Sequence, residues 1–397
     1  MPVLFLVVFV DLVGFGLIIP LLPFYGEHFQ ASPATVGLLM AIYSFTQFLA
    51  APMWGRLSDR FGRKPVLVIT LGGATLSYLW LAFAQELWML FAARALGGLM
   101  AGNIATAFAY VADITTPANR AKGMGIVGAA FGLGFIFGPA IGGMLAGHDP
   151  ANADYTSPAL LAMALSGTAM VLTLALLPES LPAEVRRAHG AMSRRSRWQM
   201  LMTALRQPSV GRLILIAFLA TFVFAGMETT FAMWSRRSFG WGPEQNGYLF
   251  AFVGLISAGV QGSLVGRLAR LFGERRLIAG GSALLAVGML AIPFATSPLL
   301  LWPAMLVVAV GFSLMTPSLN AMISLSVDAG VQGGTMGVSR SATTLARVLG
   351  PGFAGLLFEV LGKDWPFFAG ALVMCVVIGF ALGAARSGSA AGATRPH

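Results

Sequence analysis

Ionisable side chains inside long apolar stretches are the residues of this sequence that could do chemistry. Asp11 lies in LFLVVFVDLVGFGLII, Arg94 in LFAARALGG and Glu228 in AGMETTFAMW. An ionisable group in such a helix costs roughly 2.5–3.5 kcal/mol on membrane-insertion scales, so its presence points to function. A carboxyl group in an apolar environment favours its neutral form, because burial penalises the charge. This pattern suits a proton carrier.

The three ionisable residues differ in the role that their type allows. We expect Asp11 to exchange protons, unless it forms a permanent ion pair with an arginine. Arginine keeps its proton in proteins, so Arg94 would modulate Asp11, hold an anionic group or act as a structural donor between helices. Glu228 would be a second proton or substrate site, or a group that reaches a hydrated vestibule.

Other polar residues in the apolar stretches could line a substrate cavity. Arg347 follows Arg340 by seven residues, so both share a helix face and would attract an anionic substrate or pair with an acid. The neutral candidates are Gln47, Asn103, Gln261 and Asn320. All 4 histidines lie outside these stretches, and the sequence has no nucleophile–base pair or metal-ligand spacing. We therefore expect no catalytic residue, no metal and no cofactor, which disfavours an intramembrane enzyme.

The composition shows which elements must position these residues. The 397 residues are 57% hydrophobic and 10% charged, against about 25% charged in soluble domains. A membrane helix needs about 20 apolar residues. Such runs fall near 3–25, 35–55, 65–84, 87–110, 121–146, 158–178, 210–235, 245–266, 277–295, 299–322, 333–358 and 366–385. The sequence thus predicts an all-α membrane protein of twelve transmembrane helices.

The basic residues indicate an orientation rather than a nucleic-acid partner. The formal net charge is +10, and its Lys and Arg residues gather in short connections between the apolar runs. Alternate connections hold most of them, at 56–64, 120–122, 186–212 and 267–276, whereas the opposite side holds Arg236, Arg237 and Lys363. Cytoplasmic loops carry the excess of Lys and Arg, so we expect both termini to be cytoplasmic.

The longest polar interval divides the predicted spans six and six. We predict an N-terminal six-helix bundle at 1–178, a cytoplasmic linker at 179–208 with a surface helix around 197–206, a C-terminal bundle at 209–386 and a flexible cytoplasmic tail at 387–397. Short segments recur between the halves: SPATVGLL resembles GPEQNGYL, and GPAIGG resembles GPGFAG. Two pseudo-symmetric bundles related by such a repeat are a transporter plan, with the substrate site between them.

A charged loop motif occurs once in each half. Residues 55–64 read GRLSDRFGRK, and residues 266–275 read GRLARLFGER, without the acid Asp59. Gly55 would permit a close approach of helices, and Gly62 can adopt a positive φ. Asp59 would be available to a helix N-terminus or to an arginine of another helix. The alternative is a loop that sets topology only.

Together these motifs resemble those of the major facilitator superfamily, in particular its twelve-helix drug/proton antiporters and their tetracycline-efflux branch. GRLSDRFGRKP resembles the loop signature, ARALGG the helix-4 arginine motif and DLVGFGLIIPLLP the first helix of tetracycline pumps. The resemblance implies that Asp59, Arg63 and Asp113 form a relay that helps to close the cytoplasmic side, and that Arg94 takes part in proton coupling. GLGFIFGPAIGG resembles the helix-5 antiporter motif, here Gly134, Gly138, Pro139, Gly142 and Gly143.

The sequence departs from the tetracycline pumps at three places. Those pumps carry an acid in helix 3, a histidine in helix 8 and an acid in helix 9. Here Ser77 stands at the first place, Ser257 lies in the matching part of helix 8, and residues 277–295 contain no acid. The resemblance therefore implies export without naming tetracycline as the substrate.

We predict a monomeric, proton-coupled secondary transporter of a bacterial inner membrane that exports small amphipathic compounds or drugs by alternating access. Its partners would be a small-molecule substrate, protons and the lipid bilayer. Proton-coupled uptake of a small organic metabolite uses the same fold and stays an alternative. A lipid translocator is a further alternative, because an apolar cavity does not name its ligand.

Overall fold

Helices are the regular secondary structure of the described residues. The computed structural model describes residues 1–181, 208–327 and 329–392, and these ranges contain no β-strand. The linker predicted at 179–208 lies, apart from its ends, outside the described residues, and so does the surface helix predicted around 197–206. The predicted all-helical class is confirmed.

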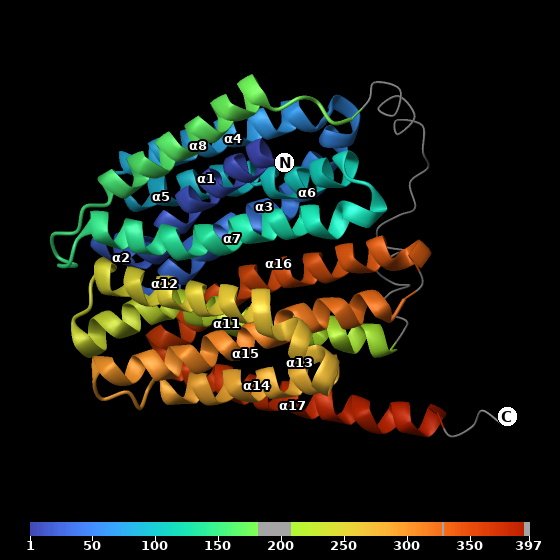
Figure 1. Cartoon of the computed structure of the whole chain (residues 1–397). Coiled ribbons are helices and arrows are strands. Elements are labelled where there is room, and N and C mark those ends of the chain that lie inside the picture. The colour runs from blue at the N-terminus through green and yellow to red at the C-terminus, as the bar shows by residue number, and fades with distance from the viewer. Residues whose placement is uncertain (182–207, 328, 393–397) are drawn as a thin grey trace. The chain divides into compact units, whose positions relative to one another are not determined.

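The first described range forms a series of helices joined by short turns (Figure 1). Proline opens several of them, since the first turn of a helix needs no backbone N–H from that position. In chain order the segments are α1 (Pro2–Ile18), the 3₁₀ turn η1 (Ile19–Leu21), α2 (Leu22–His28), α3 (Pro33–Phe61), α4 (Arg63–Ala82), α5 (Leu87–Leu99), α6 (Asn103–Ile114), α7 (Pro117–Ala146) and α8 (Thr156–Leu176).

The second and third described ranges continue in the same way. The segments are α11 (Pro208–Phe239), α12 (Pro243–Gly259), the π-helical turn η2 (Val260–Leu264), α13 (Val265–Phe272), α14 (Glu274–Ala291), α15 (Pro298–Leu325), α16 (Ala329–Val360) and α17 (Trp365–Gly392). α17 thus continues into the residues predicted for a tail at 387–397.

Each of the twelve predicted apolar runs coincides with one of these helices or with an interrupted helix. In the described ranges, 10 helices are long and apolar enough to cross a membrane. The other two runs correspond to α14 and α16, which are more polar. α14 opens on Glu274, Arg275 and Arg276, and α16 carries Arg340 and Arg347.

The chain divides into two compact units. Unit 1 contains Met1–Arg194 and Thr229–Leu255, and unit 2 contains Arg195–Glu228 and Ile256–His397. Residues 229–255 belong to unit 1 because they pack on its helices. Arg236 of α11 donates to Glu27 of α2 at 2.9 Å, and a methyl group on Gly143 of α7 would lie 2.7 Å from the Pro243 carbonyl oxygen. The six-and-six division predicted from the sequence stays a prediction.

α1 is the central helix of unit 1. It packs against both α7 and α8, while α4 packs against α8 and α5 (Figure 1). Of its 17 residues, ten are buried, and Leu12 and Leu17 are among the largest fully buried side chains. A polar residue on the buried face of this helix lies inside the bundle rather than against lipid. Asp11 is such a residue.

Candidate functional site

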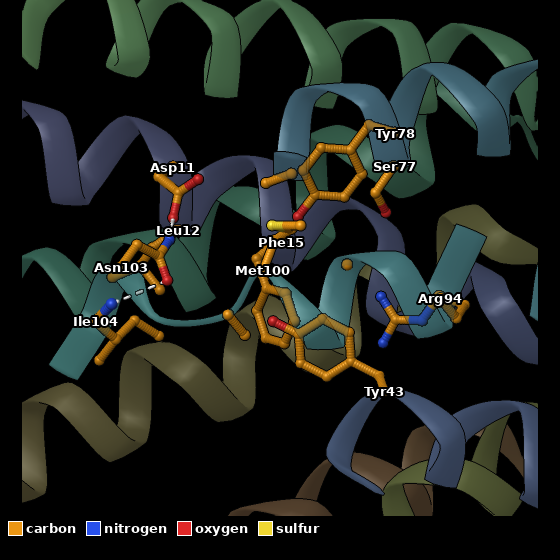
Figure 2. Close-up of a pocket in the computed structure, with 13 residues that line it drawn as sticks. Asp11, Leu12, Phe15, Tyr43, Ser77, Tyr78, Arg94, Met100, Asn103 and Ile104 are labelled. Carbon is orange, nitrogen blue, oxygen red and sulfur yellow. Dashed lines mark hydrogen bonds between the residues drawn. The ribbon is translucent and has the colours of Figure 1, made fainter. Parts of the chain in front are cut away.

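Asp11 is held in unit 1 by two neutral hydrogen-bond donors. The residue is 7% exposed, so its carboxylate depends on protein groups rather than on solvent. The Ser166 hydroxyl of α8 donates to Asp11 Oδ1 at 3.0 Å. The Asn103 amide Nδ2 donates to Asp11 Oδ2 (Figure 2). Both oxygens have a partner, and neither partner is a cation. The permanent ion pair considered from the sequence is absent from this part of the structure.

Asn103 reaches Asp11 because the fourth span is interrupted. The span predicted at 87–110 is found as Leu87–Ile114, but its helix is divided: α5 ends at Leu99 and α6 begins at Asn103. The break leaves the Leu99 carbonyl without its helical donor, and Trp54 Nε1 donates to it at 2.5 Å. Asn103 Oδ1 in turn accepts the Ile104 backbone N–H at 2.9 Å. Irregular backbone of this kind is tolerated at membrane depth only where protein or a cavity satisfies it.

Arg94 lies one and a half turns before this break, on α5. It is 5% exposed, and its guanidinium carbon lies 4.3 Å from the centroid of the Tyr43 ring. Its Nε is buried and has no hydrogen-bond partner among the described residues. The Ser77 hydroxyl donates a hydrogen bond to the neighbouring Ala93 carbonyl at 2.8 Å. Arg94 is thus packed on an aromatic ring but incompletely hydrogen-bonded.

Asp11, Arg94 and Asn103 line one cavity in unit 1. Figure 2 shows Asp11 and Asn103 at one end and Arg94 at the other, with Tyr43, Tyr78, Phe15 and Met100 between them. Asp11 and Arg94 do not form an ion pair. The cavity therefore has an acidic end and a basic end separated by aromatic and thioether side chains.

The sequence identified three lining residues of this cavity and missed its aromatic ones. Tyr43 and Tyr78 were not among the predicted residues, because nothing in the sequence distinguishes a cavity-facing aromatic from one that packs on a neighbouring helix. Ser77 was noted only as a departure from the tetracycline pumps. Gln47 of α3 is half-buried and is not part of this cavity's lining.

The remaining predicted cavity residues belong to unit 2. Arg347 Nη1 of α16 lies 3.9 Å from Glu228 Oε2 of α11, a loose ion pair in which the Glu228 side chain is 15% exposed. The sequence raised this pair as one of several possibilities for Arg347. Gln261, in the π-helical turn η2, and Asn320 of α15 are exposed.

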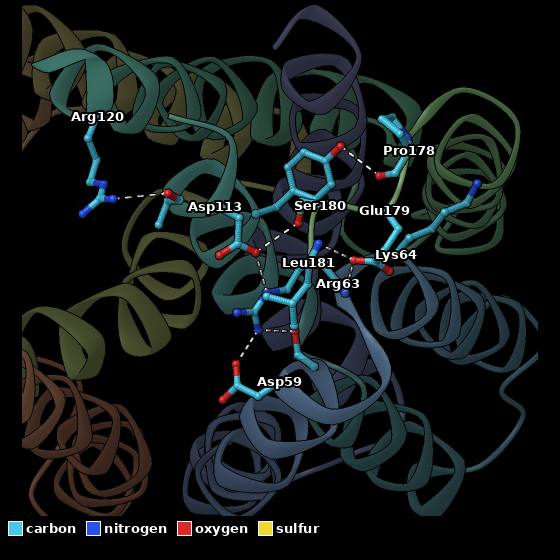
Figure 3. A network of polar contacts seen from close by, with 12 residues as sticks. Asp59, Arg63, Lys64, Asp113, Arg120, Pro178, Glu179, Ser180 and Leu181 are labelled. Atoms are coloured by element: carbon cyan, nitrogen blue, oxygen red, sulfur yellow. Dashed lines mark hydrogen bonds and ion pairs between the residues drawn. The ribbon is translucent and has the colours of Figure 1, made fainter. Parts of the chain in front are cut away.

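A polar cluster surrounds the turn between α3 and α4 (Figure 3). Arg63 Nη1 donates to Asp59 Oδ1 at 2.6 Å and to Ser58 Oγ at 2.9 Å, while its Nε donates to Asp113 Oδ2 at 2.9 Å. The Ser180 hydroxyl donates to the same Asp113 oxygen at 3.0 Å. Asp59, Arg63 and Asp113, which the resemblance grouped, therefore lie in contact. Arg63 is at the centre, with its side chain 9% exposed.

Glu179 caps the N-terminus of α4, a role that the sequence offered to Asp59. Its Oε1 accepts the Arg63 backbone N–H at 2.8 Å, and its Oε2 accepts that of Lys64 at 3.1 Å. Gly62, the residue before the helix, has φ +108, a conformation that favours glycine. This confirms the positive φ predicted for Gly62. The close helix approach expected at Gly55 is wrong, since a methyl group there would meet nothing within 4 Å.

The glycines of α7 let two helices approach it closely. A methyl group on Gly138 would lie 2.7 Å from the backbone of Gly16 on α1, and one on Gly134 would lie 2.7 Å from Leu12 Cβ. Gly142 packs against the Leu17 backbone of α1. On α12, Gly247 packs against the backbone of Pro139 and Gly143. The helix-5 motif therefore fixes α1, and with it Asp11, by direct backbone packing.

The fold defines this chain as a multi-pass membrane protein, since 10 helices in the described ranges are long and apolar enough to cross a bilayer. The described residues hold no cluster of His, Cys, Asp and Glu that could bind a metal ion. A family model described as Major Facilitator Superfamily matches residues 4–339 and 262–395. The chain belongs to this superfamily.

Named relatives are similar over nearly their whole length. The chain is 33% identical over 362 residues to the tetracycline resistance protein, class C, of Escherichia coli, covering 89% of this chain and 88% of the relative. It is 32% identical over 380 residues to multidrug resistance protein 2 of Bacillus subtilis, covering 94% and 92%. The predicted resemblance to the tetracycline-efflux branch is confirmed.

Solved transporter structures share the fold. The human organic anion transporter MFSD10 (TETRAN) has a TM-score of 0.73 and 27% identity, covering 96% of this chain and 98% of the other. A bacterial homologue of the human lysosomal transporter Spinster, in an inward-facing and occupied conformation, has a TM-score of 0.81 and 16% identity, covering 97% and 96%. The second likeness concerns the fold alone.

Proposed function

We propose that this protein exports small amphipathic compounds, including drugs, in exchange for protons. Its relatives named for tetracycline and multidrug resistance support export of drugs. The observation that carries the proposal is the buried carboxyl of Asp11, whose two oxygens accept hydrogen bonds from the neutral donors Ser166 and Asn103 in a cavity shared with Arg94.

Asp11 is suited to exchange a proton because no cation fixes its charge. Burial disfavours an unpaired charge, whereas the two donors favour the ionised form, so the opposing effects leave both states accessible. A substrate and a proton that prefer different states of Asp11 would each promote release of the other. Arg94, in the same cavity, would modulate this balance through its fixed positive charge.

Other predicted residues have roles in this proposed cycle. The cluster of Asp59, Arg63 and Asp113 would stabilise one of the two states of alternating access, as a cytoplasmic gate. Glu228 would be a second proton acceptor, because its protonation would release Arg347, whose side chain is 45% exposed. Gln47, Gln261 and Asn320 stay proposed substrate contacts. We place the protein in a bacterial inner membrane as a monomer with both termini cytoplasmic.

Everted membrane vesicles from an efflux-deficient bacterial host test the proposal. The vesicles are acidified inside by respiration, and a pH-sensitive acridine dye reports the gradient. Adding tetracycline or ethidium should release protons from vesicles that contain the protein. Asp11→Asn should reduce this release at least tenfold, because an amide cannot exchange a proton. Glu86→Gln, the same change on an exposed acid, should leave it unchanged.

Two results would contradict the proposal. Proton release that is equal in wild type and Asp11→Asn would remove Asp11 from coupling. Intact cells give the direction of transport: an exporter lowers ethidium accumulation, whereas higher accumulation in cells that contain the protein would indicate uptake.

A further inference from the structure

Arg94 is a buried cation that the protein leaves incompletely satisfied. The Tyr43 ring, 4.3 Å from the guanidinium carbon, interacts with the flat face of the group. The N–H bonds of a guanidinium lie in its plane, so stacking on a ring leaves them available to acceptors. Arg94 Nε is buried and finds no acceptor among the described residues. A buried donor without a partner is costly, and the cost is greater for a charged group.

The nearest acid of the cavity does not satisfy Arg94. Asp11 lies at the opposite end, and both of its oxygens already accept hydrogen bonds, from Ser166 and Asn103. Arg94 Nε therefore lacks an acceptor among the described residues, while the acidic end has a donor for each Asp11 oxygen. A ligand that completes the site must bring the acceptor to Arg94.

A glycine near Arg94 lets two residues of the cavity pack closely against α5. Gly97 follows Arg94 by three residues, so both lie on one face of α5, and both line the cavity. A methyl group on Gly97 would lie 2.8 Å from the Ser77 hydroxyl oxygen and 3.5 Å from the Tyr43 ring. A larger residue at this position would displace Ser77 or Tyr43, which line the same cavity. The buried donor and the aromatic lining of the cavity are two independent observations at one place.

We propose that Arg94 binds the anionic group of an aromatic organic acid, a carboxylate or phenolate attached to a ring. Arginine matches such groups because its planar fork donates two parallel hydrogen bonds. The ring would lie against Tyr43, Tyr78 and Phe15, which line the middle of the cavity. This substrate class rests on the proposed function of the protein as a transporter of amphipathic compounds.

Matched acids and amides test the charge requirement. The probes are 2-naphthoate with 2-naphthamide and salicylate with salicylamide, titrated calorimetrically into the purified full-length protein in detergent. We expect wild type to bind each acid roughly 10- to 100-fold more tightly than its amide, as hydrogen bonds to charged groups require. Arg94→Gln should abolish this preference by weakening only the acid, and Arg94→Lys should retain part of it. Glu86→Gln is the control that keeps it.

Three results would overturn the proposal: equal affinity of wild type for acid and amide, no detectable binding of either acid, or an acid preference that survives in Arg94→Gln. Gel filtration checks that each variant is folded. If Arg94→Gln is not folded, Arg94→Lys is compared with wild type instead. Proton release from vesicles is measured separately. Wild type that shows proton-coupled export but binds acid and amide equally would refute this inference alone. Acid preference without proton release would refute the proposed coupling instead.

Discussion

Removing the carboxylate of Glu179 should destabilise the contact between the N-terminus of α4 and the segment that follows α8. Glu179 accepts the first two backbone N–H groups of α4, at 2.8 and 3.1 Å, with one oxygen each. These donors have no partner inside the helix, and the helix dipole favours a negative charge at this end. A hydrogen bond to a charged group contributes about 1.5–3 kcal/mol. Because Glu179 is half-exposed, we take the lower end of this range for both bonds together.

Glu179→Ala should therefore lower the free energy of unfolding by about 2 kcal/mol. Glu179→Gln keeps an acceptor and loses the charge, so its cost should be about half as large. Thermal unfolding followed by tryptophan fluorescence in detergent should show the highest midpoint for wild type, a lower one for Glu179→Gln and the lowest for Glu179→Ala. The control is Glu86→Ala, since Glu86 occupies the N-cap of α5 without a capping hydrogen bond. The prediction is wrong if Glu179→Ala has the same unfolding midpoint as wild type, or if Glu86→Ala lowers the midpoint as much as Glu179→Ala does.

Two further substitutions separate packing from gating. Gly138→Ala should destabilise the protein by about 1–3 kcal/mol, because its methyl group would lie 2.7 Å from the Gly16 backbone. The control Gly125→Ala, whose methyl group would meet nothing within 4 Å, should be neutral or stabilising. Equal shifts of the thermal unfolding midpoint in the two variants would contradict this prediction. Asp59→Asn should slow ethidium efflux while changing stability by less than about 1 kcal/mol, because Asp59 is 48% exposed and Arg63 keeps its bond to Asp113. An unchanged efflux rate would leave the loop a topology signal.

Most of the helices could be predicted because each needs one simple signal, a long apolar run. The interruption at 100–102 could not, because the sequence there, GLMAG at 98–102, is as apolar and as rich in small residues as an unbroken span. The break is accompanied by a tertiary contact, the donation of Trp54 to the Leu99 carbonyl across 45 positions of the chain. Local sequence holds no trace of such a contact.

The candidate site was partly predictable for a similar reason. Asp11 and Arg94 stand out because charge is rare inside apolar runs, and Asn103 because it is polar in the same setting. Tyr43 and Tyr78 do not stand out in a chain that is 11% aromatic. Glu179 was missed because its partners are 116 and 115 positions away and because its own surroundings read as the start of a linker.

The two copies of the loop motif show which of its features belong to the backbone and which to function. At an offset of 211, Gly62 corresponds to Gly273, and both have a positive φ, +108 and +78. The charges, however, are reversed: the acid–base order of Asp59 and Arg63 becomes Arg270 and Glu274. Arg270 donates to the Gly266 carbonyl at 3.2 Å instead of forming an ion pair with Glu274.

The turn geometry therefore does not require the ion pair, because the second copy forms the same turn without it. If the charges served only to set topology, a basic turn would suffice, as in the second copy. The first copy adds a nearly buried arginine bound by two acids and a serine, which costs desolvation that a simple turn does not need. That added cost is the physical reason to assign the gate to the first copy and to expect Asp59→Asn to alter transport more than stability.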